Sequence, residues 1–177
     1  MSNYLSIAAA TAALQAILAD AVQVVSGARV AIERPQREDA DSSAPRVNLF
    51  LYHVSPHAAW RATDIREQVA VDLHYLLTFY GDDKRLEPHL LLGSVIRRLH
   101  EEPFLTRVRI ADSEEQAQYM AFPGAMTSEL AQQEDPVKIT PIPLTLDDLS
   151  KIWSAFLQAP FALSIAYQVG AVLIDRE

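Results

Sequence analysis

The sequence predicts an α+β or α/β fold in which a mixed, mostly antiparallel β-sheet packs against helices. Residues 46–55 and 69–80 are long runs of branched and aromatic side chains, a composition typical of strands. Segments with apolar residues at helical spacing lie before and after these runs. A length of 177 residues fits one domain, so we expect residues 1–177 to form a single domain.

The first element is predicted to be an amphipathic helix over residues 3–25. This stretch is rich in alanine and leucine, and its apolar side chains recur on one face at helical spacing. Ser2 or Asn3 can cap its start, and Gly27 can end it. Because polar side chains interrupt the apolar stretch, it makes a poor transmembrane span, and we expect its apolar face to be buried in the core.

Three strands are expected after this helix. Residues 28–33 alternate as a short strand that stops at Pro35. Residues 46–55 carry large apolar groups on both faces, which predicts a central strand covered from both sides. Residues 69–80 are the strongest strand candidate, bounded by the turn signal that begins at Gly81.

A second helix is predicted over residues 86–101, ended by Pro103. Its arginines are expected to face water, and its buried face is expected to consist of Leu92, Val95, Ile96 and Leu99. Residues 107–136 are weakly patterned, with short helices expected at 113–119 and 127–133. A long connection of this kind is often functional.

The C-terminal part is expected to add a strand, a helix and a final strand. Two prolines push the strand at residues 138–144 to an edge of the sheet. Thr145 and Asp148 have the spacing of residues that cap a helix start. Residues 161–174 are continuously apolar, which predicts a buried strand.

Composition excludes several classes of function. The formal net charge is −8 and no basic stripe is visible, so we expect neither nucleic acid nor an anionic membrane as a partner. The absence of cysteine excludes disulfides, thiolate metal sites and cysteine nucleophiles. With no leader or anchor recognised at the N-terminus, we expect a cytoplasmic product.

No constellation of residues predicts catalysis. The histidines lack the spacing of a three-ligand metal site, no serine has a base and an acid at suitable spacing, and no glycine-rich phosphate loop is present. We therefore expect a protein that is not an enzyme, with no catalytic, metal-binding or cofactor-binding residues and no cofactor. An alternative is a monomeric binding domain or small enzyme with a pocket near His53 and His57.

Surface for partner proteins is predicted in the loops, at 36–45, 57–68 and 107–136. The second of these contains a tryptophan next to an arginine, two residue types that are enriched at interface hot spots. Packing of the tryptophan over the sheet edge is the competing interpretation. The candidate interface residues are Trp60, Arg61, Asp64 and Arg66.

Several separated motifs, in order, resemble a known family. They are Val-Asn-Leu-Phe-Leu-Tyr-His-Val-Ser-Pro at 47–56, the strand and turn at 69–82, Leu-Glu-Pro-His at 86–89, Leu-Ser-Lys-Ile-Trp-Ser at 149–154 and Pro-Phe-Ala-Leu-Ser-Ile-Ala-Tyr at 160–167. They are similar to the N-terminal domain of the cap, or tail-terminator, proteins of extracellular contractile injection systems. That domain was formerly classed as a domain of unknown function, and the resemblance covers nearly the whole chain.

The resemblance implies a phage tail-terminator-like fold and a structural role. Such proteins form a hexameric ring at the end of the inner tube away from the baseplate, where they stop tube and sheath polymerisation. It therefore implies a homo-hexamer, inner tube and sheath proteins as partners, and assembly in the cytoplasm of a particle that can be released. Some relatives carry a further domain after this one. A phage tail-completion or connector protein is the alternative within the structural class.

Overall fold

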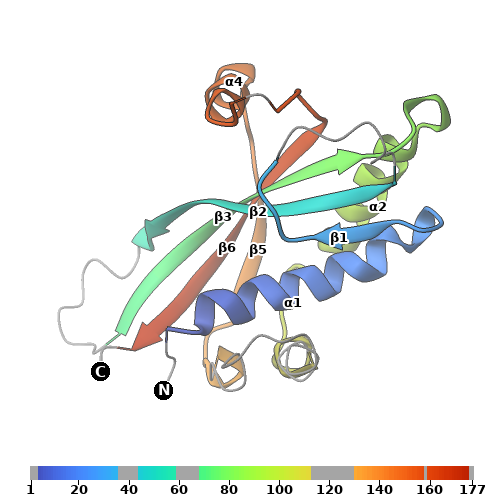
Figure 1. Ribbon diagram of the computed structural model, residues 1–177. Helices are drawn as coiled ribbons and strands as arrows, with labels where there is room; N and C mark the ends of the chain where they lie inside the picture. Colours follow the sequence, from blue (N-terminus) through green and yellow to red (C-terminus); the bar gives the residue numbers. More distant parts are fainter. Residues whose placement is uncertain (1–3, 36–43, 59–67, 113–129, 158, 176–177) are drawn as a thin grey trace.

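The computed structural model describes residues 4–35, 44–58, 68–112, 130–157 and 159–175. Within these ranges the chain forms helices on both faces of one β-sheet (Figure 1). The helices are α1 (Ser6–Ala21), α2 (Glu87–Glu101) and α4 (Leu146–Ser154), with 3₁₀ turns η1 (Val22–Val24), η3 (Asp83–Arg85) and η5 (Leu130–Gln132). The strands are β1 (Arg29–Ala31), β2 (Arg46–Pro56), β3 (Gln68–Tyr80), β4 (Phe104–Leu105), β5 (Val137–Ile142) and β6 (Ser164–Asp175).

The sheet has six strands in the order β1-β2-β3-β6-β5-β4. The β1–β2 pair is parallel and every other pair is antiparallel. The mixed, mostly antiparallel sheet predicted from the sequence is therefore confirmed. All five predicted strands are present, the last beginning at Ser164 rather than at residue 161, whereas the two-residue strand β4 was not predicted.

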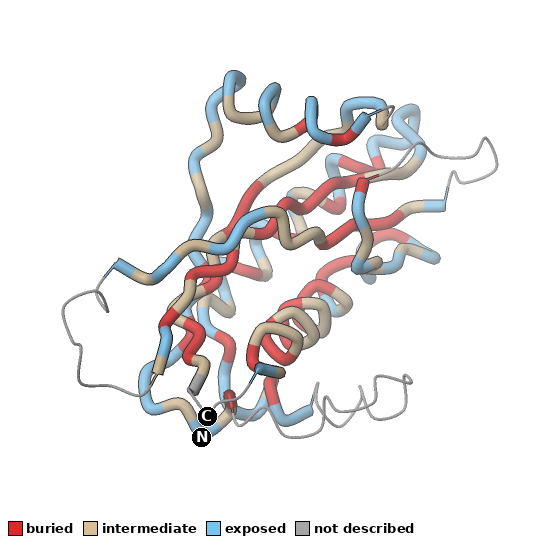
Figure 2. Tube along the Cα trace, turned by 60° about the vertical axis from the view of Figure 1, so that its left-hand side comes forward, coloured by how far each residue is buried: buried red, intermediate tan, exposed pale blue. Residues whose placement is uncertain are grey.

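The larger core lies between the sheet and the helices α1 and α2. Odd-numbered residues of β3, such as Leu73 and Leu77, point into this core together with the buried face of α1. The hydroxyl of Tyr75 lies 2.7 Å from Oγ1 of Thr11 on α1, and burial raises the pKa of Tyr75 to about 12. Figure 2 shows the buried residues concentrated along β3, β6 and α1.

Packing accounts for the apolar composition of α1. The stretch Ser6–Val24 is long and apolar enough to cross a membrane by length and composition, a test that core helices also pass. The helix begins after Leu5, where no side chain caps it, and the predicted caps Ser2 and Asn3 lie outside the described residues. Gly27 does sit in the turn that follows, with φ of 76°.

The buried face of α2 differs from the prediction at Ile96, which is 42% exposed. Val95 and Leu99 are buried as predicted, and Leu91, which was not predicted, joins them at four-residue spacing. The helix is thus rotated so that Ile96 lies beyond the rim of its contact with α1. Leu92 is partly buried against the core.

An ionic network joins α1 and α2 to a helical stretch at residues 107–112. Asp20 accepts hydrogen bonds from Arg98, at 2.9 Å, and from Arg109, at 3.0 Å. Both arginines also pair with Glu102, and hydrogen bonds to Glu102 and then Asp20 raise the pKa of Arg109. Arg98, expected to face water, is therefore partly buried among charged partners.

The opposite face of the sheet carries a smaller core under α4. Thr145 and Asp148 form the predicted capping box at the start of this helix. Trp153 and Phe156 then pack on Leu76 of β3. In Figure 2 most of the remaining α4 surface is exposed.

Candidate interface

The predicted interface residues Trp60, Arg61, Asp64 and Arg66 lie outside the described residues. The two ends of the segment that carries them are described. The His57 N–H donates to Ala70 O at 2.9 Å, so β2 and β3 remain paired up to this point. The β2–β3 connection therefore starts at the end of the hairpin remote from the Gly81 turn and α2 (Figure 1).

A polar patch lies near this end, on the same face of the sheet as α4, next to Tyr52 of the smaller core. Ser55 Oγ is 3.0 Å from Nε2 of His74, and the His53 and His74 rings are 5.1 Å apart. Burial lowers the pKa of His74, His53 lowers it further, and Asp72 opposes both. His74 is thus a paired residue of the sheet.

His57 belongs to a second pair in the same patch. Its Nδ1 lies 2.8 Å from Oδ1 of the buried Asp72. This carboxylate lies against Gly170 of β6, where a Cβ atom would overlap it. The acid therefore orients His57, whereas the serine contacts His74, so the four side chains do not form a nucleophile–base–acid triad.

Metal binding finds no support in the described ranges. No group of three or more histidine, aspartate or glutamate side chains there could hold a metal ion. The patch offers hydrogen-bonding groups to a partner surface.

The edges of the sheet are protected unequally. On β6, the Gln133 side chain donates to Ala171 O at 2.9 Å and accepts from the Leu173 N–H at 3.2 Å, as a neighbouring strand would. On β5, strand β4 covers only Val137 and Lys138, so Pro141 lies at the predicted edge. On β2, the described part of the chain places a strand beside residues 46–48 and none beside the outer edge of 49–56.

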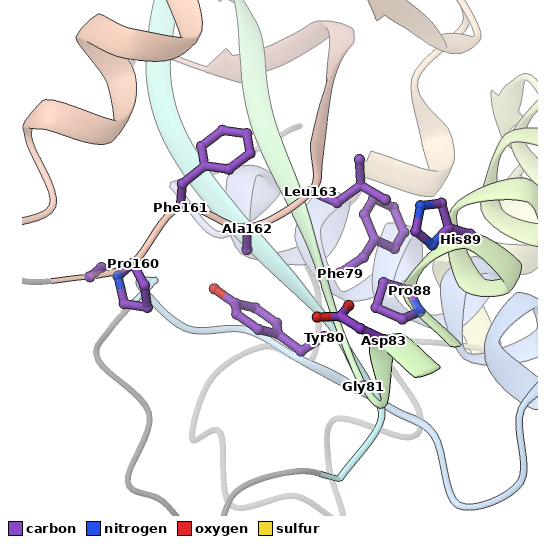
Figure 3. A pocket seen from close by; sticks show the side chains of 11 residues that line it. Phe79, Tyr80, Gly81, Asp83, Pro88, His89, Pro160, Phe161, Ala162 and Leu163 are labelled. Carbon is purple, nitrogen blue, oxygen red and sulfur yellow. The ribbon is translucent and has the colours of Figure 1, made fainter. Parts of the chain in front are cut away.

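A cavity of about 750 Å³ opens at the other end of the β2–β3 hairpin (Figure 3). It lies between the end of β3, the start of α2 and the segment that leads into β6. Phe161 is 67% exposed at its rim, with its ring 5.4 Å from that of Trp153. The lining residues are Phe79, Tyr80, Gly81, Asp83, Pro88, His89, Ala159, Pro160, Phe161, Ala162 and Leu163.

Neither His53 nor His57 lines this cavity, which differs from the pocket considered in the sequence. No local sequence pattern predicts the whole of this cavity, because three segments far apart in the chain build it. The available signal was local: Pro160 and Phe161 form an exposed apolar pair directly before a buried strand. Most of the side chains that line the cavity are apolar or aromatic, but polar atoms contribute nearly as much of its surface, and Asp83 supplies an exposed carboxylate. Such a lining suits a segment that combines an apolar ring with a polar or charged group.

Comparison with known proteins identifies relatives of this fold. A sequence model of the Pvc16 N-terminal domain matches residues 9–177, whereas no curated protein sequence matches the chain. The fold is similar to the PVC sheath/tube terminator of an extracellular contractile injection system in its extended state, with a TM-score of 0.63 and 15% identity over 99% of this chain and 57% of that chain. The anti-feeding prophage cap, a tube-terminating cap, gives a TM-score of 0.44 and 15% identity over 82% of this chain and 48% of that chain. The chain therefore spans about half the length of these two proteins, and the predicted tail-terminator-like fold is confirmed.

Proposed function

The chain belongs to the Pvc16 N-terminal domain family, and on that premise we propose that it caps the end of a contractile injection particle. The observation that carries this proposal is the family match over residues 9–177. The shared fold with a sheath/tube terminator supports it. The role is structural, and the chain needs no cofactor for it.

The finer proposal is a homo-hexameric ring on the end of the inner tube away from the baseplate. There the ring stops tube growth and holds the last sheath ring, so its partners are the inner tube and sheath proteins. Residues 1–177 act as one domain of this ring, assembled in the cytoplasm onto a particle that can be released. A closed ring requires head-to-tail interfaces that close by rotation.

Two surfaces support assembly with partner proteins. The outer edge of β2 offers backbone groups to which a partner can add a strand. The β2–β3 connection carries Trp60, Arg61, Asp64 and Arg66, which we assign to ring or sheath contacts. The paired histidines beside this connection supply hydrogen-bonding groups at the same end of the molecule.

The test is end binding and growth arrest on preformed tubes. Purified protein is added to tube and sheath proteins during assembly, and tube lengths and labelled ends are measured by electron microscopy. We expect label at one end of each particle and shorter, uniform tubes. Unlabelled ends and unchanged lengths would overturn the proposal.

A double variant, Trp60→Ala with Arg61→Ala, tests the assigned contacts. We expect it to lose end binding while its circular dichroism spectrum stays that of the original protein. Arg97→Ala is the matched control, because Arg97 is exposed and pairs only with Glu101 on its own helix among the described residues. A double variant that assembles normally would remove these residues from the interface.

A further inference from the structure

The cavity at the Gly81 end of the hairpin has the chemistry of a receptor for a large aromatic side chain. Proline and aromatic rings form most of its wall, and the exposed Phe161 extends this surface beyond the rim. A tryptophan side chain buries about 150–250 Å² in such a site and is a leading hot-spot residue. The volume of about 750 Å³ exceeds one indole, so neighbouring residues of the same segment can enter with it.

The chain itself carries a segment with matching chemistry. Trp60 is followed by Arg61, and the cavity presents the carboxylate of Asp83 beside its aromatic wall (Figure 3). An indole in the apolar part would place an adjacent guanidinium near this carboxylate, where charge-assisted hydrogen bonds form. Trp153, the other tryptophan of the chain, is buried under α4 and is not available.

This segment cannot reach the cavity of its own molecule. Ala70 pairs with His57, and Tyr80 lies ten residues further along β3, roughly 33 Å at the rise of a strand. Trp60 lies two residues after Ala58, so its Cα stays within roughly 8 Å of that residue. A tryptophan side chain is too short to span the rest of the distance between this connection and the cavity. The occupant must therefore come from another molecule.

We propose that the cavity receives the β2–β3 connection of a second copy of this chain, with Trp60 seated against Phe161 and Tyr80. The β2–β3 connection that carries Trp60 is the donor, and the cavity at the Gly81 end is the receptor. They lie at opposite ends of the hairpin, so the contact is head-to-tail. Repetition of this contact generates the proposed ring if the rotation between neighbouring copies closes, and an open filament if it does not. The inference names the subunit contact of the ring and to that extent rests on the proposed function.

The test is complementation between two variants, followed by sedimentation. Trp60→Ala removes the donor and Ala162→Trp fills the receptor, so each alone is expected to self-associate about 30-fold more weakly, the change for a hot spot of ~2 kcal/mol. In an equimolar mixture the intact donor of Ala162→Trp meets the intact receptor of Trp60→Ala. That mixture should form a heterodimer and nothing larger, because the remaining donor and receptor are both disabled.

Controls separate the cavity from a general effect of the substitution. Ala155→Trp makes the same change at an exposed position of the chain that does not line the cavity, and it should associate like the original protein. Phe161→Ala, which removes the rim and fills nothing, replaces Ala162→Trp if the latter is unfolded by circular dichroism. Equal association of the Ala162→Trp, Ala155→Trp and original proteins, or a mixture that stays monomeric, would overturn the inference.

Assembly that occurs only on tube ends is tested by cross-linking. The chain has no cysteine, so Trp60→Cys and Ala162→Cys introduce unique thiols in separate copies. We expect a short bismaleimide to join the two copies in particles, and particles that yield no such product would contradict the inference. End binding without this cross-link would leave the cap function standing, whereas complementation in solution without end binding would leave the subunit contact standing.

Discussion

Gln133 stabilises the free edge of β6 with its side chain, and its replacement tests how this edge is protected. The amide donates to Ala171 O and accepts from the Leu173 N–H, and it also donates to Asp135 O at 2.8 Å. The Gln133→Ala substitution removes all three bonds. It leaves an N–H and a C=O of β6 without their observed partner, at a place that is only partly open to water.

The expected loss follows from these contacts. The two partly buried bonds to β6 contribute about 1 kcal/mol each. Water at the edge replaces part of this, and the alanine variant no longer loses the up to ~2 kcal/mol of rotamer entropy that ordering the glutamine side chain costs. We therefore expect the free energy of unfolding to fall by about 1 kcal/mol, with a Tm lower by roughly 2–4 °C for a domain of this size.

Urea unfolding of two adjacent glutamine variants measures this loss. Gln132 is exposed, so Gln132→Ala should stay within ~0.5 kcal/mol of the original protein. Gln133→Glu keeps the acceptor for Leu173 but turns a carboxylate towards Ala171 O, so it should be destabilised at neutral pH and recover as acid protonates it. Equal stabilities of the Gln132→Ala and Gln133→Ala proteins would refute the assignment of edge protection to this side chain.

Three further outcomes are expected. Thr145→Ala should cost about 1 kcal/mol of unfolding free energy by removing the capping box of α4, and a loss no larger than that of Ser150→Ala on the same helix would contradict this. Asp20→Asn should lower stability by at most ~1 kcal/mol, because Asp20 is half exposed. The difference in stability between this variant and the original protein should shrink in high salt. A difference that salt leaves unchanged would argue against an ionic origin. The pKa of His74 is lower in the folded protein than in the unfolded chain, so folding disfavours its protonation and stability falls as pH drops below the ordinary histidine range. His74→Gln should make this fall in stability at acid pH less steep in denaturation curves. An unchanged slope would assign the fall to other groups.

The long strands were predictable because their sequences repeat one signal many times. β2, β3 and β6 each carry a run of branched and aromatic residues that only a covered sheet buries. The capping box of α4 was equally clear, since Thr145 and Asp148 satisfy each other within three residues. The edge position of β5 was predictable because its prolines have no backbone N–H to donate to a further strand.

The missed features depend on contacts between distant segments. Strand β4 has two residues, too few for any period to show, and it exists because β5 pairs with it. Ile96 was assigned to the core by spacing alone, but the contact of α2 with α1 selects Leu91, Val95 and Leu99. No sequence pattern predicts the role of Gln133, because this role depends on the position of β6 in the folded protein.

The cavity belongs with these missed features, since no local pattern aligns Gly81, Pro88 and Phe161. The candidate interface at Trp60 to Arg66, which the sequence did suggest, stays a prediction. The sequence thus suggested a donor for assembly, and we propose the cavity as its receptor.

Unequal protection of the edges bears on how such a protein stops growth rather than joining it. A free strand edge can pair with further strands without limit. On one side of the sheet, the Gln133 side chain bound to β6 and Pro141 within β5 block such pairing. A contact made by a side chain entering a cavity has a defined geometry, so it ends growth when its rotation closes into a ring. Under the proposed function, the ring closes through the cavity, and the particle binds the outer edge of β2 at residues 49–56, beside which the described part of the chain places no strand. Loss of the Gln133 contact should accordingly add non-specific association without changing the complementation between Trp60→Ala and Ala162→Trp.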